Sequence, residues 1–163
     1  MILDTNLLLS GAISAAGALT GQLVTTASAL STNTIDMASV ALGGNQATDV
    51  GAGEALEISI SVLVAPASCT DVQFQLIQAD DAALTSNVQV INQTAAFVIA
   101  SLPAGTIVPL HYDRAAPYAP KRYVGVRYVS TGTTITAMSV VAGVVKNVQD
   151  VKNISYKSGF SVT

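Results

Sequence analysis

The chain has 163 residues, of which 50% are hydrophobic and only 10% are charged, and its formal net charge is −3. This length suits one domain with a proper core, and a charged fraction far below the ~25% of ordinary soluble domains favours a surface that is partly covered in an assembly. Because Cys69 is the only cysteine, an intrachain disulfide is excluded.

Charge is unevenly distributed along the chain. No lysine or arginine precedes residue 114, whereas a single acid, Asp150, follows it. All five tyrosines also lie from Tyr112 onward. Opposite charges separated in this way must pair within one fold, between copies, or on a partner. The basic residues are Arg114, Lys121, Arg122, Arg127, Lys146, Lys152 and Lys157.

Residues 1–31 are expected to form an extended N-terminal arm. A weak helix could be written over Ala12–Leu30, but Thr25-Thr26 and the glycines at 17 and 21 favour an extended or loop-like segment. Polar residues interrupt the uncharged run from 5 to 35, so no apolar stretch near 18 residues exists and no membrane span is expected. An acid at position 4 and the lack of early basic residues argue against a secretory signal.

The segment from 56 to 64 begins a clear β pattern. Its even positions are apolar and its odd positions mostly polar, which predicts a strand with one buried face, ended by Pro66. Residues 72–76 repeat the pattern, with Val72, Phe74 and Leu76 inward, and Asp80-Asp81 predicts a turn.

Later strands are predicted at 88–91, 96–99, 106–108, 122–129 and 134–145. Seven or eight short strands with almost no helical periodicity predict an all-β sandwich or barrel over residues 32–150, followed by a tail at 151–163. Three prolines bracket an irregular loop, Tyr112–Lys121, which is a natural contact surface.

Catalytic chemistry finds little support. His111 is the only histidine, so a histidine metal centre is disfavoured, and no nucleophile-elbow motif accompanies it. Asp80-Asp81 lacks the spacing of a calcium loop. We therefore predict a protein that is not an enzyme and binds no cofactor or metal.

Arginine, lysine and tyrosine interleave in the last third of the chain. A nucleic-acid surface is disfavoured by the low charge density and the lack of a binding motif. The same residue types are enriched at protein–protein interfaces, where we expect them to meet acids on another subunit or partner. The candidate interface residues are Arg114, Tyr118, Lys121, Arg122, Tyr123, Arg127, Tyr128 and Phe160.

Several segments together resemble the capsid cement (decoration) proteins of tailed bacteriophages. They are Met1–Asp4 with Leu7–Ser10, then Ser31–Met37, then Asp49–Leu56 before the first long strand, and finally Val148–Asp150, Tyr156 and Gly159-Phe160. The long segment Ala12–Leu30 and the loop Tyr112–Lys121 depart from that family's pattern.

The resemblance implies a jelly-roll sandwich of about eight antiparallel strands, usually trimeric. It implies a protein made in the bacterial host cytoplasm and placed on the outer surface of the capsid. There it would sit at threefold or quasi-threefold positions and clamp neighbouring major capsid proteins against internal DNA pressure. The expected partners are the major capsid protein and the chain itself. The alternatives are another virion β-sandwich, such as a head fibre or tail module, or a carbohydrate-binding sandwich using Tyr112, Tyr118 and Tyr123.

Overall fold

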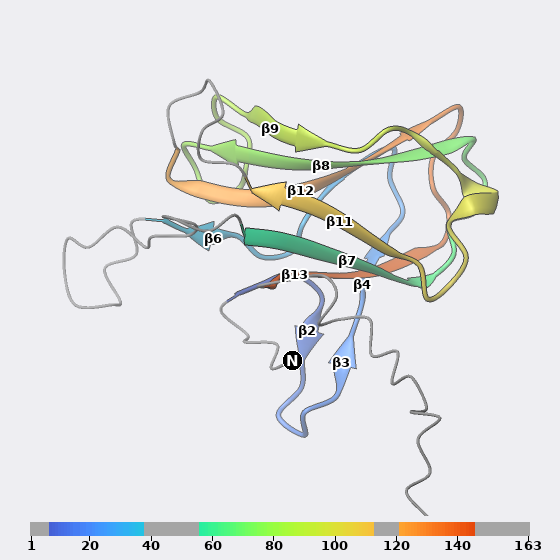
Figure 1. The fold of residues 1–163 in the computed structure, drawn as a ribbon, viewed down its shortest axis with the longest axis horizontal. Coiled ribbons are helices and arrows are strands. Elements are labelled where there is room, and N and C mark those ends of the chain that lie inside the picture. Colours follow the sequence, from blue (N-terminus) through green and yellow to red (C-terminus); the bar gives the residue numbers. More distant parts are fainter. Residues whose placement is uncertain (1–6, 38–55, 113–120, 146–163) are drawn as a thin grey trace, which may run out of the picture.

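The computed structural model describes residues 7–37, 56–112 and 121–145. These residues form two antiparallel sheets that face each other, and they contain no α-helix (Figure 1). The strands are β1 (Leu8–Ser10), β2 (Ala12–Ile13), β3 (Leu19–Thr20), β4 (Gln22–Val24), β5 (Ser28–Leu30), β6 (Ile35–Asp36), β7 (Leu56–Val64), β8 (Asp71–Ala79), β9 (Gln89–Gln93), β10 (Phe97–Val98), β11 (Ile107–Tyr112), β12 (Tyr123–Thr131) and β13 (Met138–Val145), with a 3₁₀ turn at Ile99–Ser101.

Each sheet has four strand positions. In the first, here the β13 sheet, β1 and β4 share one side of β13, and β7 and β11 follow on the other side. In the second, the β12 sheet, β5 and β6 share one side of β12, while β8 and then β9 with β10 follow on the other. The chain changes sheet between most consecutive positions, and its first and last strand positions lie side by side. The predicted all-β antiparallel sandwich is therefore confirmed, and this order of strands resembles that of a jelly roll.

Period-two side chains build the core between the sheets. In β7, Ile58, Ile60 and Val62 are buried, and in β8, Val72 and Phe74 are fully buried, as their alternation predicts. The Phe74 ring contacts Phe97 and Tyr128 edge-on, at centroid distances of 6.1 and 5.9 Å. The core thus follows from the sequence pattern of the long strands.

A second, smaller apolar cluster covers the outer face of the β12 sheet. Ile77 and Ala79 of β8 lie under Leu84, which belongs to the loop between β8 and β9. Gly125 of β12 makes room for this loop, because a Cβ atom there would lie 2.3 Å from Leu84 Cδ1. The end of β8 is therefore buried on both faces.

The N-terminal segment differs from the expected free arm. It is extended, but β1 and β4 pair with β13, and β5 and β6 pair with β12. Residues 8–36 therefore complete both sheets, and no boundary at residue 31 separates them from the sandwich. Only the β2–β3 hairpin leaves the sandwich (Figure 1).

Several strand limits differ from the sequence prediction, and the two largest differences are four residues each. β11 continues to Tyr112, and the last strand begins at Met138, four residues later than predicted. Ile135 is fully buried while Thr134 and Thr136 are exposed, so these residues form a loop that inserts one apolar side chain. Among the described residues, no helix has the length and apolarity needed to span a bilayer. Residues 113–120 of the predicted loop Tyr112–Lys121 and the predicted tail 151–163 lie outside the described residues.

Candidate functional interface

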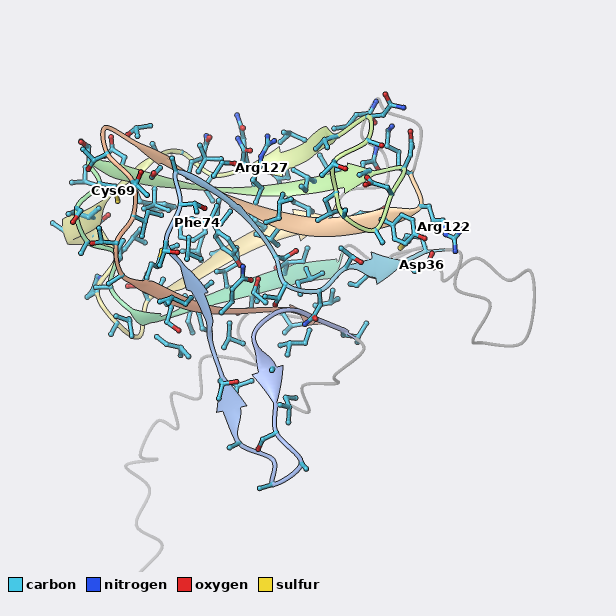
Figure 2. All side chains as sticks on the ribbon, turned by 180° about the vertical axis from the view of Figure 1, so that it is seen from behind. Asp36, Cys69, Phe74, Arg122 and Arg127 are labelled. Carbon is cyan, nitrogen blue, oxygen red and sulfur yellow. The ribbon has the colours of Figure 1, made fainter. Side chains whose placement is uncertain are left out.

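Charged side chains gather at one end of the β12 sheet, where β12 begins. Tyr123 pairs in register with Asp36 of β6, so Arg122 is carried next to that carboxylate. Arg122 Nε and Nη2 donate to Asp36 Oδ1 and Oδ2, both at 2.9 Å, in a bidentate ion pair (Figure 2). These hydrogen bonds raise the pKa of Arg122. The Arg122 guanidinium also lies 5.0 Å from the centre of the Tyr123 ring.

A second ion pair lies beside the first. Lys121 Nζ is 3.0 Å from Asp80 Oδ1, at the end of β8. Asp80 also accepts a hydrogen bond from Asn87 Nδ2 at 2.7 Å, and this bond together with Lys121 lowers the pKa of Asp80. The Lys121 backbone amide donates to Gln78 Oε1 at 3.2 Å. We call Asp36, Asp80, Lys121, Arg122 and Tyr123 the charged end.

Next to the charged end, Asp81 organises the β8–β9 loop. Its carboxylate accepts hydrogen bonds from the backbone amides of Thr85 and Ser86, at 2.8 and 2.7 Å, and from the Thr85 hydroxyl at 2.7 Å. The Ser86 amide bond is the main cause that lowers the pKa of Asp81. The loop that carries Leu84 over the sheet is therefore held by an ionised carboxylate.

Farther along the same outer face, Arg127 belongs to a network of glutamines. Arg127 Nε donates to Gln75 Oε1 at 2.7 Å, and Gln75 Nε2 donates to the side-chain oxygens of Gln73 and Gln93 at 3.0 Å. Among the residues described, Arg127 forms no ion pair. This part of the face is polar but carries few charges (Figure 2).

Two predictions for the basic third need correction. Lys121 and Arg122 were expected to meet acids on another subunit or partner, but both pair with acids of their own chain. Tyr128 was expected at an interface, but its side chain is fully buried, and its hydroxyl lies 2.7 Å from Ser10 Oγ inside the sandwich. Tyr128 is therefore a core residue.

The structure brings Lys121, Arg122 and Tyr123 together, with Arg127 farther along β12. The remaining candidates, Arg114, Tyr118 and Phe160, lie outside the described residues.

Sequence reasoning missed the acidic partners at this site. Asp36 stands 86 positions from Arg122 and belongs to a two-residue strand, β6, which is too short to show a period. Asp80 was recognised as a turn residue, yet its pairing across 41 positions with Lys121 depends on the order of the strands. The glutamines of β8 carried a signal, since their alternation with Val72 and Phe74 already placed Gln73 and Gln75 on the outer face.

The remaining reactive side chains do not converge. His111 Nδ1 is 3.6 Å from Glu57 Oε1 at the edge of the β13 sheet, and Cys69 is buried at the opposite end from Arg122 (Figure 2). Burial raises the pKa of the Cys69 thiol, which makes the reactive thiolate scarcer. Within residues 7–37, 56–112 and 121–145, no group of three histidine, cysteine or acidic side chains could hold a metal ion.

Comparison with protein families gives a match. A family model described as Bbp16 matches residues 18–144, which covers most of the chain, from just before β3 into β13. A comparison with curated proteins found no significant match.

Proposed function

The chain belongs to the Bbp16 family, whose name is phage-related, and we propose that it is a structural protein of a phage virion that binds the outside of the capsid. The family match over residues 18–144 is the observation that carries this proposal. In the proposed role, the chain forms a trimer, as the resemblance to cement proteins implies. The trimer holds neighbouring major capsid proteins together at threefold or quasi-threefold positions.

The sandwich architecture supports this role. A protein displayed in many copies must not pair its sheet edges with those of its neighbours. Here the edge strand β11 has Pro109 in its middle, and proline has no backbone N–H to donate to another strand. Asn92 Nδ2 donates a hydrogen bond of 2.9 Å to the His111 carbonyl oxygen, which is thereby already occupied. Such devices suit a protein that is concentrated on a surface while staying soluble.

The proposed mechanism is multivalent clamping. Packaged DNA loads the shell from inside, and the junctions between capsid subunits bear that load. An oligomer that contacts several subunits at once adds binding energy through effective concentration, so each single contact can be modest. The clamp needs no chemistry beyond complementary surfaces.

We place the capsid contact at the charged end. Asp36 holds the Arg122 guanidinium in one geometry, so Arg122 can be presented to a partner with little further loss of side-chain freedom. Arg122 also stacks near Tyr123, and arginine and tyrosine are the side chains most enriched in binding hot spots. Because the charges already pair in the chain, they select partner and orientation more than they add affinity.

The test is binding to expanded capsids that lack the protein. Wild-type protein should co-sediment with such shells, saturate, and raise the temperature at which they rupture. Absence of saturable binding would sink the capsid role and leave a head fibre, a tail module or a non-virion function.

A charge swap tests the location of the contact. Asp36→Arg combined with Arg122→Asp keeps an internal ion pair but exchanges the two charges, so the fold should survive while capsid affinity falls by roughly tenfold or more. Asp71→Lys, at the opposite end of β8, is the matched control and should bind like wild type. Equal affinity of all three proteins would move the contact away from the charged end.

The carbohydrate-binding alternative gains no support from the two of its three proposed tyrosines that the structure describes. Tyr112 is buried, and Tyr123 is half-buried with Arg122 against its ring. Sugar-binding surfaces use exposed rings for stacking. Binding to a glycan array, with no capsid binding, would favour this alternative over ours.

A further inference from the structure

Exposed large apolar side chains collect on one face of the molecule. The described residues contain five of them, and four lie on or next to the outer face of the β13 sheet, whereas Val98 lies on β10 of the other sheet. Isolated exposed leucines are ordinary, but a contiguous group marks a contact surface. The four are Leu19, Leu23, Leu63 and Val64, with exposed fractions of 42%, 66%, 43% and 49%.

The strand register makes these side chains neighbours. Leu23 of β4 pairs with Ser139 of β13, and Ser139 pairs with Val64 of β7. Leu63 falls at the irregularity in the β7–β13 register, and its Cδ1 lies 2.9 Å from where a Cβ of Gly21 would be. Leu19 is two residues before Gly21. We call these four side chains and the β2–β3 hairpin the neutral face.

The hairpin projects from this face and is fixed at its base. Figures 1 and 2 both show β2 and β3 pointing away from the sandwich. Gly11 and Gly21 let its two ends lie flat on β13, because a Cβ on Gly11 would lie 2.6 Å from Thr20 O and one on Gly21 would lie 2.2 Å from Ser139 Oγ. The base is therefore set by close backbone contact.

The body of the hairpin has no such support. From Ala12 to Thr20 only Ile13 is partly covered, and the tip is a turn in which Gly17 adopts φ +79°. Its turn bonds link Ser14 with Ala18 and Gly17 at 2.8 Å. A two-stranded hairpin alone is at best marginally stable in water. An apolar hairpin in this position would be stabilised by packing against another surface.

Charge decides between the two possible occupants. No residue from 7 to 35 is charged, so the hairpin and β4 carry no charge. Permanent contacts between identical chains are the apolar, charge-depleted class of interface. A neutral surface is complementary to a second copy of itself, whereas the charged end offers the polar features that a different protein would recognise.

We propose that the neutral face is the contact between copies of this chain, with the β2–β3 hairpin of one copy lying on Leu23, Leu63 and Val64 of the next. A ring of three and a twofold pair both satisfy this contact. The inference deepens the self-association in the proposed function, but it concerns a different sheet from the proposed capsid contact and is measured without capsids.

The experiment measures the mass of the pure protein in solution over a range of concentrations, by sedimentation equilibrium. Wild type should be an oligomer. Leu23→Lys and Leu63→Lys should weaken association by about tenfold or more, because every contact would then bury an unpaired ammonium. Val98→Lys, an equally apolar and exposed position on the other sheet, should associate like wild type.

A second variant removes the hairpin. Gly11 and Gly21 approach closely, so Ala12–Thr20 can be replaced by Asn-Gly with the sandwich kept intact. This protein should retain its β circular dichroism spectrum and be monomeric.

A monomeric wild type, or a Leu23→Lys variant that associates like wild type, would overturn the inference. The inference would also be overturned if the leucine variants kept the oligomer mass of wild type but lost capsid binding, since the neutral face would then contact the capsid. An oligomeric wild type that ignores capsids counts against the proposed function alone.

Discussion

The hydroxyl groups of Tyr128 and Ser10 join the two sheets inside the core. They lie 2.7 Å apart, both residues are fully buried, and burial raises the pKa of Tyr128 well above its usual value. Each hydroxyl is therefore the partner that makes burial of the other tolerable.

Tyr128→Phe should lower the free energy of unfolding by about 1–3 kcal/mol, because Ser10 Oγ would remain buried without its partner. Ser10→Ala should cost a similar amount. The double variant should lose clearly less than the sum, since it leaves neither group unpaired. Urea denaturation of the four proteins measures this, and strictly additive losses would contradict the role given to the pair.

The Asp81 carboxylate should make the stability of the folded protein depend on pH in acid. Its pKa is lowered in the folded protein, chiefly by the Ser86 amide, so the folded state binds its proton more weakly than the unfolded chain does. The stabilising effect is thus fully present above the unfolded pKa, about 4, and is lost as the pH falls through the lower folded value.

Thermal unfolding of wild type should therefore show a falling midpoint below about pH 4. Asp81→Asn should be less stable than wild type at pH 6 and should lose less on acidification. A wild-type midpoint that is unchanged down to pH 2 would contradict this. Asp71→Asn is the comparison, because within the described part of the chain the Asp71 carboxylate accepts a single side-chain hydrogen bond, from the Thr131 hydroxyl at 3.2 Å.

The burial of Tyr128 shows that residue type alone does not reveal which face of a strand a side chain lies on. Arg127 and Tyr128 are adjacent on a strand and so point to opposite faces. Val124, Val126 and Tyr128 share the buried face, whereas Arg127 lies on the outer one. The period of β12 carried this information, but the preference of tyrosine for interfaces pointed the other way.

At the scale of elements, Gly125 controls how the β8–β9 loop lies on the β12 sheet. A Cβ here would lie 2.3 Å from Leu84 Cδ1 and 2.8 Å from Ser31 Oγ. Leu84 can turn away, but it would then leave Ile77 and Ala79 uncovered, and Ser31 is fixed by its hydrogen bonds to Asn33 O and from the Val126 amide.

Gly125→Ala should therefore destabilise the protein by about 1–3 kcal/mol, the usual cost of overpacking. It should also speed hydrogen exchange of residues 80–88. In a Leu84→Ala background the same substitution should cost less, because one of the two clashes is gone. An equal cost in both backgrounds would place the strain at Ser31.

Long strands were predictable from the sequence, and short ones were not. β7 was predicted with the observed limits, and the centres of β8 and β12 were also recognised, because eight or nine alternating residues show a clear period. The strands β1 to β6 have two or three residues each, which carry no period. The positions of β1, β4, β5 and β6 are set by pairing with β12 and β13, which is a tertiary effect.

At the scale of the whole molecule, three of the strands within residues 8–30, β1, β4 and β5, belong to the sandwich. Removing residues 1–31 would take β1, β4 and β5 from both sheets and expose the buried side chains of β12 and β13. We expect that truncated chain to lose cooperative unfolding. A truncated protein with a wild-type melting midpoint would instead restore the arm predicted from the sequence.

Part of the charge split along the sequence is resolved inside one chain, because Lys121 and Arg122 pair with acids from its first half. The strand order sets β12 between β8 and the β5–β6 position, so acids at 36 and 80 flank the start of a strand that is preceded by Lys121 and Arg122. Sequence reasoning recognised that the charges must meet and that no domain boundary separates them. It chose contact between subunits because a single sequence does not reveal which strands are neighbours.

The same strand order has a consequence for how the protein is made. β12 and β13 come last in chain order among the described strands. They are the inner strands of their sheets, and every strand from β1 to β6 except the hairpin pairs with one of them. The early strands must therefore stay unpaired until β12 and β13 have been synthesised. Folding of the sandwich is then dominated by contacts between residues far apart in the sequence, which makes it slow. The scarcity of strong β periods before residue 56 helps the waiting segment to stay free of wrong pairings during that interval.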